Sequence, residues 1–103
     1  MSTERITKAR ELFERFPTND LSRYSLAQAL FDAGQYAEAA EHLQALCTKK
    51  SDWMVVHILL GKCRLHTGPP ADAKKLFDHA LQLAHAQHHD GPREELEQLL
   101  NTL

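Results

Sequence analysis

Apolar residues recur at spacings of three and four positions along most of the chain, which is the period of an amphipathic α-helix. The segment 3–16 shows the pattern plainly, with Ile6, Ala9, Leu12, Phe13 and Phe16 on one face. The strict alternation that is typical of a half-buried strand is missing. Ala, Leu, Gln, Glu, Lys and Arg, all good helix formers, dominate the periodic segments. The pattern therefore predicts an all-α protein.

Proline and glycine divide this pattern into separate helices. Pro17 is expected to end the first, because the residue before a proline is disfavoured in the helical region. Gly34 and Gly68 each follow an apolar-periodic stretch, as helix-terminating glycines do. The connecting segments are short, so consecutive helices are expected to lie antiparallel. The predicted helices are about six in number and cover residues 3–16, 20–33, 36–48, 53–67, 70–88 and 92–102.

The chain also repeats itself. A shift of 34 residues places Gly34 on Gly68 and Leu26 on Leu60. Small residues fall on small ones, and large apolar residues on large apolar ones. Two antiparallel helices approach closely only where one side chain is small, so these positions are predicted helix contacts. The matched pairs are Ala27 with Gly61, Ala39 with Ala73, and Leu43 with Phe77.

The period and these residues resemble the tetratricopeptide-repeat (TPR) family, whose pattern contains Leu-Gly and, further on, Ala-x3-Phe. The second copy carries Leu60-Gly61 and Ala73-x3-Phe77, and the first carries Leu26-Ala27 and Ala39-x3-Leu43. The sequence departs from the family pattern at its Trp, its Tyr and its closing Pro. Those positions hold Arg23 and His57, Leu30 and Arg64, and Ser51.

The resemblance implies a TPR-like α-solenoid, a right-handed superhelical array of antiparallel helix pairs, in a single domain over residues 1–103. The first helix corresponds to the second helix of a preceding repeat. The period fails after the second copy, so the last helix is expected to cap the stack, which would otherwise expose its apolar end. The expected units are a half-repeat at 3–17, repeats at 20–53 and 54–87, and a capping helix at 92–103.

In this family the first helices of the repeats form a concave groove that binds peptides or partner helices, so the resemblance implies a non-catalytic protein-interaction module. Carboxylate binding of the kind known in one branch is not expected, because Tyr24, Ser25, Ile58 and Leu59 occupy several of its positions. Two alternatives remain: the first helix covers the apolar stripe, or a second copy does so in a homodimer. The implied groove residues are Leu21, Tyr24, Gln28, Phe31, Asp32, Val55, Ile58, Lys62, Leu65 and His66.

Composition narrows the classes of partner. Apolar residues make up 43% and charged residues 25%, with 12 basic against 14 acidic side chains and a formal net charge of -2. A chain without basic excess is not expected to bind nucleic acid. The longest apolar runs are Trp53–Val56 and Ile58–Gly61, too short to span a membrane. Cys47 and Cys63 form no disulfide framework and no secretory signal is visible, so a cytoplasmic setting is expected.

The chain contains seven histidines, which makes histidine the first residue type to consider as a metal ligand. His85 and His89 stand four apart, which would place them on one helical face and makes them a weak candidate for a metal site. The alternative is a solvated helix end, where the terminal carbonyls favour charged histidine. No phosphate loop, nucleophile elbow or carboxylate pair is visible, so neither an enzyme nor a cofactor is expected. A thiol–imidazole pair of Cys63 with His57 or His66 is also disfavoured, because apolar surroundings raise a thiol's pKa.

Overall fold

A computed structural model describes the backbone of residues 2–103 and the side chains of residues 3–103. Within that range the chain forms helices and turns and no strand. The helices are α1 (Ser2–Arg15), α2 (Asp20–Asp32), α3 (Tyr36–Lys49), α4 (Met54–Thr67), α5 (Pro70–Ala86) and α6 (Asp90–Asn101). The predicted all-α class is confirmed.

The helix ends follow from local chemistry. Asn19 caps α2, where its side-chain oxygen accepts a hydrogen bond from the backbone N–H of Ser22 at 3.1 Å. Gly34 has a φ of 80°, the left-handed conformation that glycine adopts without strain, and it turns the chain from α2 into α3. Gly68 ends α4 in another way, since its φ of -138° is extended. Pro70 stands at the first position of α5, where its missing N–H costs nothing.

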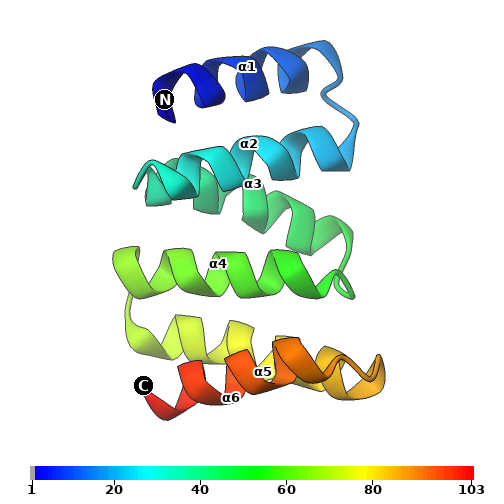
Figure 1. Ribbon diagram of the computed structural model, residues 1–103, viewed down its shortest axis with the longest axis vertical. Coiled ribbons are helices and arrows are strands. Elements are labelled where there is room, and N and C mark those ends of the chain that lie inside the picture. Colours follow the sequence, from blue (N-terminus) through cyan, green and yellow to red (C-terminus); the bar gives the residue numbers. More distant parts are fainter. Residues whose placement is uncertain (1) are drawn as a thin grey trace.

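The helices stack in chain order, and each packs against the one before it and the one after it. In Figure 1, α2, α4 and α6 lie toward the viewer, and α3 and α5 lie behind them. The N-terminus and the C-terminus lie at opposite ends of the stack. α2 and α4 also touch directly. The result is a layer formed by α2, α4 and α6, backed by α3 and α5.

Two apolar clusters hold the stack together. The larger joins α2, α3 and α4 around fully buried leucines such as Leu26 and Leu43, and α1 covers part of it. The smaller joins α4, α5 and α6 around Phe77 and Leu96. The predicted close contact of small and large residues is present: a Cβ built on Gly61 would lie 2.5 Å from the Phe77 ring. α4 therefore approaches α5 as closely as the missing side chain allows.

The boundary between α5 and α6 differs from the prediction. α5 ends at Ala86 and α6 begins at Asp90, two residues before Pro92. His88, with a φ of 58°, turns the chain, and His89 is the residue that precedes α6. His85 and His89 are therefore not on one helical face, and the geometry on which the weak metal candidate rested is absent. The turn was not predicted because its residues, Gln87, His88 and His89, include no glycine or proline.

None of the helices in the described part of the chain combines the length and the apolar character that crossing a membrane requires.

Candidate functional site

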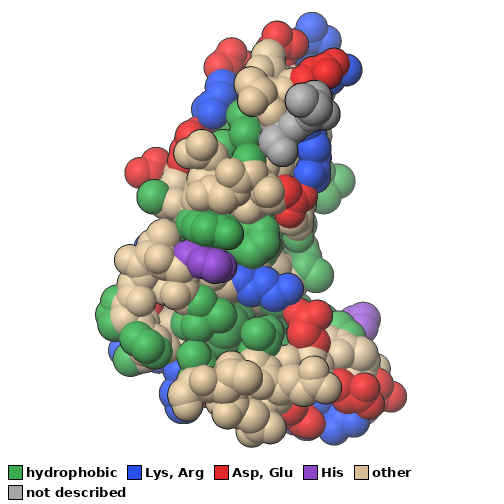
Figure 2. Space-filling view, turned by 60° about the vertical axis from the view of Figure 1, so that its left-hand side comes forward, with side chains coloured by type: hydrophobic (Ala, Val, Ile, Leu, Met, Phe, Trp, Pro, Cys, Tyr) green, Lys and Arg blue, Asp and Glu red, His purple; other side chains and the backbone are tan. Residues whose placement is uncertain are grey.

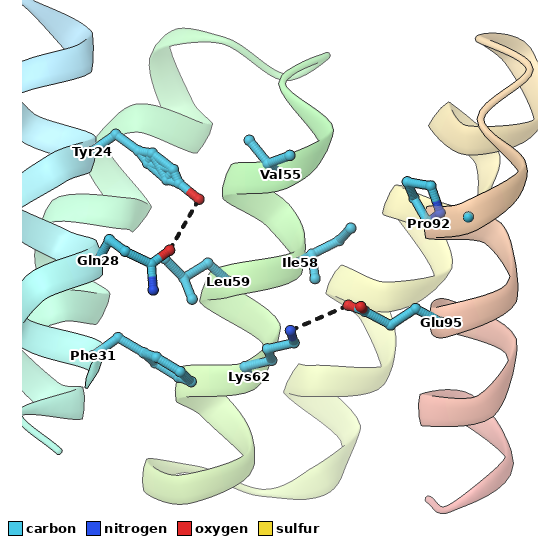
Figure 3. A pocket seen from close by; sticks show the side chains of 10 residues that line it. Tyr24, Gln28, Phe31, Val55, Ile58, Leu59, Lys62, Pro92 and Glu95 are labelled. Atoms are coloured by element: carbon cyan, nitrogen blue, oxygen red, sulfur yellow. Dashed lines mark hydrogen bonds and ion pairs between the residues drawn. The ribbon is translucent and has the colours of Figure 1, made fainter. Parts of the chain in front are cut away.

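A cavity of about 430 Å³ opens between α2, α4 and α6 (Figure 3). We call it the groove. Residues from three helices that are distant in sequence form its walls. They are Tyr24, Gln28 and Phe31 from α2; Val55, Ile58, Leu59 and Lys62 from α4; and Gly91, Pro92 and Glu95 from α6.

The α4 wall of the groove is apolar and partly open to solvent. Val55 is 43% exposed, whereas Ile58 and Leu59 are only 8% and 5% exposed and form the deeper surface. Figure 3 shows Val55 and Ile58 beside the opening, with the Tyr24 and Phe31 rings on the α2 side. Exposed apolar surface in a concavity is where a partner's apolar side chains are favourably buried.

The charged side chains of the groove are paired with each other. Lys62 Nζ from α4 lies 3.2 Å from Glu95 Oε1 on α6, and this ion pair crosses the groove (Figure 3). Along α2, the Tyr24 hydroxyl donates to Gln28 Oε1 at 3.4 Å. Burial raises the pKa of Tyr24, so this hydroxyl stays protonated and uncharged. The groove thus contains polar groups but no net charge of its own.

Aromatic contacts border the groove at both ends. At one end the Tyr24 ring meets Trp53 edge-on, with the ring centroids 5.7 Å apart. At the other end Phe31 meets the edge of Tyr36, which in turn stacks on His66 with the centroids 3.9 Å apart. Edge-on and stacked aromatic pairs restrict the rings that take part. Trp53 therefore contacts α2 as well as the turn that precedes α4.

The structure brings six of the ten predicted groove residues together around this cavity: Tyr24, Gln28, Phe31, Val55, Ile58 and Lys62. The other four do not line it. Leu21, at the start of α2, is 68% exposed, and Leu65 is 38% exposed. Asp32 instead pairs with Arg5 of α1, and His66 stacks on Tyr36.

Sequence reasoning missed Leu59 and the whole α6 wall, which Gly91, Pro92 and Glu95 form. The 34-residue period fails at α6, so no repeat signal aligned it with α2 and α4. α1 contributes no residue to the lining. The alternative in which the first helix covers the apolar stripe is therefore wrong for this cavity.

The described residues hold no group of three or more His, Cys, Asp or Glu side chains placed to bind a metal ion. Burial raises the pKa of the Cys63 thiol to about 11, which disfavours the thiolate that a nucleophile needs. His57 is held by the Trp53 carbonyl, 2.9 Å from its Nδ1. These side chains contribute to packing, and the groove remains the candidate site.

On the molecular surface, apolar side chains lie together and charged side chains lie beside them (Figure 2). In Figure 2, hydrophobic side chains gather across the middle of the face that is presented. Basic and acidic side chains and a histidine lie beside them. The apolar area is continuous enough to offer contact to a partner over more than one side chain.

Comparison with known proteins decides the family. The TPR repeat-containing protein PA0015 of Pseudomonas aeruginosa is 35% identical over 77 residues, which is 75% of this chain and 72% of that protein. The chain belongs to the tetratricopeptide-repeat family. TPR proteins generally bind other proteins and are generally non-catalytic. No family model matches the chain.

A solved structure supports the same TPR-like fold. The solution structure of protein BPP2914 from Bordetella parapertussis superposes with a TM-score of 0.80. The match covers 94% of this chain and 84% of that one at 22% identity. At this identity the likeness concerns the arrangement of helices, and it agrees with the repeat read from the sequence.

Proposed function

We propose that this TPR protein is a non-catalytic interaction module and that its groove binds an apolar segment of another protein, either a peptide or a helix. The observation that carries the proposal is the partly exposed apolar wall of α4, which faces aromatic rings of α2 across a cavity of about 430 Å³. Binding is the activity that we propose, because the lining offers apolar surface and an ion pair, and TPR proteins are generally non-catalytic.

The paired charges support an apolar partner. Since Lys62 and Glu95 already neutralise each other, a bound apolar segment leaves no charge in the groove without a partner. Gln28 and the Lys62–Glu95 pair can orient the segment through hydrogen bonds at the edges. The two free cysteines, Cys47 and Cys63, suit a reducing compartment, and we place the module and its partners in the cytoplasm.

Two substitutions of the same kind test the proposal. Val55→Glu puts a carboxylate on the groove wall, whereas Leu65→Glu puts one at a position of similar exposure outside the groove, 38% against 43%. Both variants should fold, as circular dichroism would show. Affinity capture from the native extract, quantified by mass spectrometry, should find proteins retained at least ten-fold less by Val55→Glu than by Leu65→Glu. Equal retention by the two variants would place the binding surface elsewhere.

A homodimer is the second candidate, and exposed apolar residues of the N-terminal helix favour it. Leu12 is 44% exposed and Phe16, just beyond the end of α1, is 48% exposed. A second copy could cover this surface, since exposed apolar patches mark association sites. Light scattering at micromolar concentration tests the homodimer. A wild-type dimer that Leu12→Glu converts to a monomer supports self-association, and a wild-type monomer contradicts it.

A further inference from the structure

The two longer walls of the groove are helical stripes (Figure 3). The lining residues of each wall recur at spacings of three and four positions, so they lie on one face of their helix. They are Val55, Ile58, Leu59 and Lys62 on α4, and Tyr24, Gln28 and Phe31 on α2. The first and last residues of each stripe are seven positions apart. That separation is about 10 Å along a helix axis, so each wall is about two helical turns long.

A two-turn stripe is the surface that one helix offers to another. Packed helices place the i±3 and i±4 rows of side chains of one helix between those of the other. Val55, at the start of the α4 stripe, is 43% exposed, so the chain does not fully cover this row. Among the described residues, α6 packs against α5 and not closely against α4, so the groove separates α4 from α6. A further helix can therefore place its side chains between α4 and α6.

The apolar part of the groove offers little hydrogen bonding to a bound backbone. The side chains of Val55, Ile58 and Leu59 have no polar atom. The backbone N–H groups of Ile58 and Leu59 lie inside α4, where they bond to the preceding turn. On the α6 wall, Gly91 has no side chain and Pro92 has no backbone N–H. An extended segment on these walls would leave the backbone groups that face them without partners.

The polar side chains of the lining are already engaged with neighbours. The Tyr24 hydroxyl donates to Gln28 Oε1 at 3.4 Å, and Gln28 Nε2 donates to Asp32 Oδ1 at 2.9 Å. Lys62 Nζ pairs with Glu95 Oε1 at 3.2 Å. The hydrogen-bonding capacity that these side chains keep lies at the α2 edge and at the ion pair. It cannot satisfy successive residues of an extended chain, and a buried backbone group without a partner is unfavourable.

We propose that the groove binds an amphipathic helix, whose apolar residues at i, i+3, i+4 and i+7 pack along α4 between α2 and α6. The inference rests on the proposed function of the groove and narrows its ligand to one conformation. A helix satisfies its own backbone N–H and C=O groups, so it requires only side-chain contact from the groove. Its apolar stripe has the same spacing as the α4 stripe. An extended segment would instead present every second side chain.

Two phage-displayed peptide libraries test the inference on the intact chain. Both contain sixteen-residue peptides in which four positions vary among Leu, Ile, Met and Phe, within polar sequence that lacks Pro and Gly. The variable positions are i, i+3, i+4 and i+7 in the first library, and i, i+2, i+4 and i+6 in the second. Peptides that bind Val55→Glu are removed before selection on the wild-type protein. The first library should supply at least about ten-fold more ligands than the second.

A matched pair of substitutions in the best peptide separates helix formation from composition. Proline or alanine replaces one residue at the middle of the peptide, on the side away from the apolar stripe. Proline keeps every apolar side chain but breaks a helix interior, whereas alanine is the best helix former. Fluorescence anisotropy should show that proline weakens binding by about 100-fold and that alanine changes it by less than about two-fold.

The outcomes separate this inference from the proposed function. If the alternating library supplies as many ligands as the first, or if the best ligand tolerates proline, the groove remains the site and the helical conformation is wrong. If neither library yields a ligand that Val55→Glu loses and Leu65→Glu keeps, both the groove proposal and the inference fail. Val55→Lys places the opposite charge at the same exposed position and should lose the same ligands. Circular dichroism should show native helicity for all three variants.

Discussion

Substitution of Gly61 by alanine probes the closest helix contact in the molecule. An added Cβ would lie 2.5 Å from Cε1, 2.8 Å from Cδ1 and 3.0 Å from Cζ of Phe77. Carbon atoms in favourable contact are about 3.5–4.0 Å apart, so the new methyl group overlaps the ring by roughly 1 Å. Phe77 is fully buried and cannot swing into solvent. α4 and α5 must therefore move apart, or the ring must leave its rotamer.

The magnitude follows from two opposing effects. Overpacking of this kind costs about 3 kcal/mol, the upper part of the usual range. Alanine gains about 1 kcal/mol over glycine in a helix interior. The net loss of unfolding free energy for Gly61→Ala should be about 2 kcal/mol, which lowers the melting temperature by roughly 8–16 °C in a domain of this size. Urea denaturation measures the free energy and thermal denaturation measures the melting temperature, both followed by circular dichroism.

Two further variants test whether the contact of Gly61 with Phe77 causes the loss of stability. Gly91, in the first turn of α6, has no atom within 4 Å of the site of a Cβ, so Gly91→Ala should leave stability unchanged or raise it. Phe77→Leu in the Gly61→Ala background gives the Ala–Leu combination that Ala27 and Leu43 show in the first copy. It should recover at least about 1 kcal/mol relative to the sum of the single changes. A Gly61→Ala protein as stable as the wild type would refute the close approach of α4 and α5.

Three other perturbations have defined outcomes. Burial lowers the pKa of His42 and of His57 below 6.5, so the unfolded chain binds more protons as the pH falls through that value. Unfolding free energy should therefore decrease from pH 7.5 to pH 5.5, and less steeply in His42→Gln; a pH-independent stability would contradict this. Leu60→Ala, at a fully buried position, should cost about 2–5 kcal/mol in urea denaturation, and a loss under 1 kcal/mol would show a loosely packed core. Burial raises the pKa of Cys47 and of Cys63 to about 11, so at pH 8 only about 0.1% is thiolate. Both thiols should react with a disulfide reagent far faster after denaturation than before, and rapid labelling of the folded protein would show that they are accessible.

Much of the fold could be predicted because its determinants are local or periodic. The Gly34 turn and the helix start at Pro70 depend on single residues with restricted backbone behaviour. The close contact of Gly61 with Phe77 was predictable because the 34-residue shift places a small and a large residue at matching positions of both copies. The prediction was wrong at His88. This residue adopts a left-handed backbone conformation that no neighbouring residue indicates.

The candidate site was only partly predictable, because its third wall depends on tertiary packing. Leu96 of α6 is buried against α5, and this contact sets the position of the helix. That position brings Glu95 to within 3.2 Å of Lys62. No repeat position marks Glu95, so the ion pair across the groove had no signal in the sequence. Leu21 shows the opposite error: it shares the periodicity of Tyr24 and Gln28 but does not line the cavity.

Binding of an apolar segment in the groove can be mapped by two-dimensional ¹H–¹⁵N NMR on the intact chain. A peptide selected by phage display on the wild-type protein serves as the probe. If the groove binds the peptide, chemical-shift changes should saturate together at the backbone amides of Tyr24, Ile58, Lys62 and Glu95, and they should be lost in Val55→Glu. Changes concentrated instead on α3 and on the outer face of α5, with these groove amides unmoved, would contradict it.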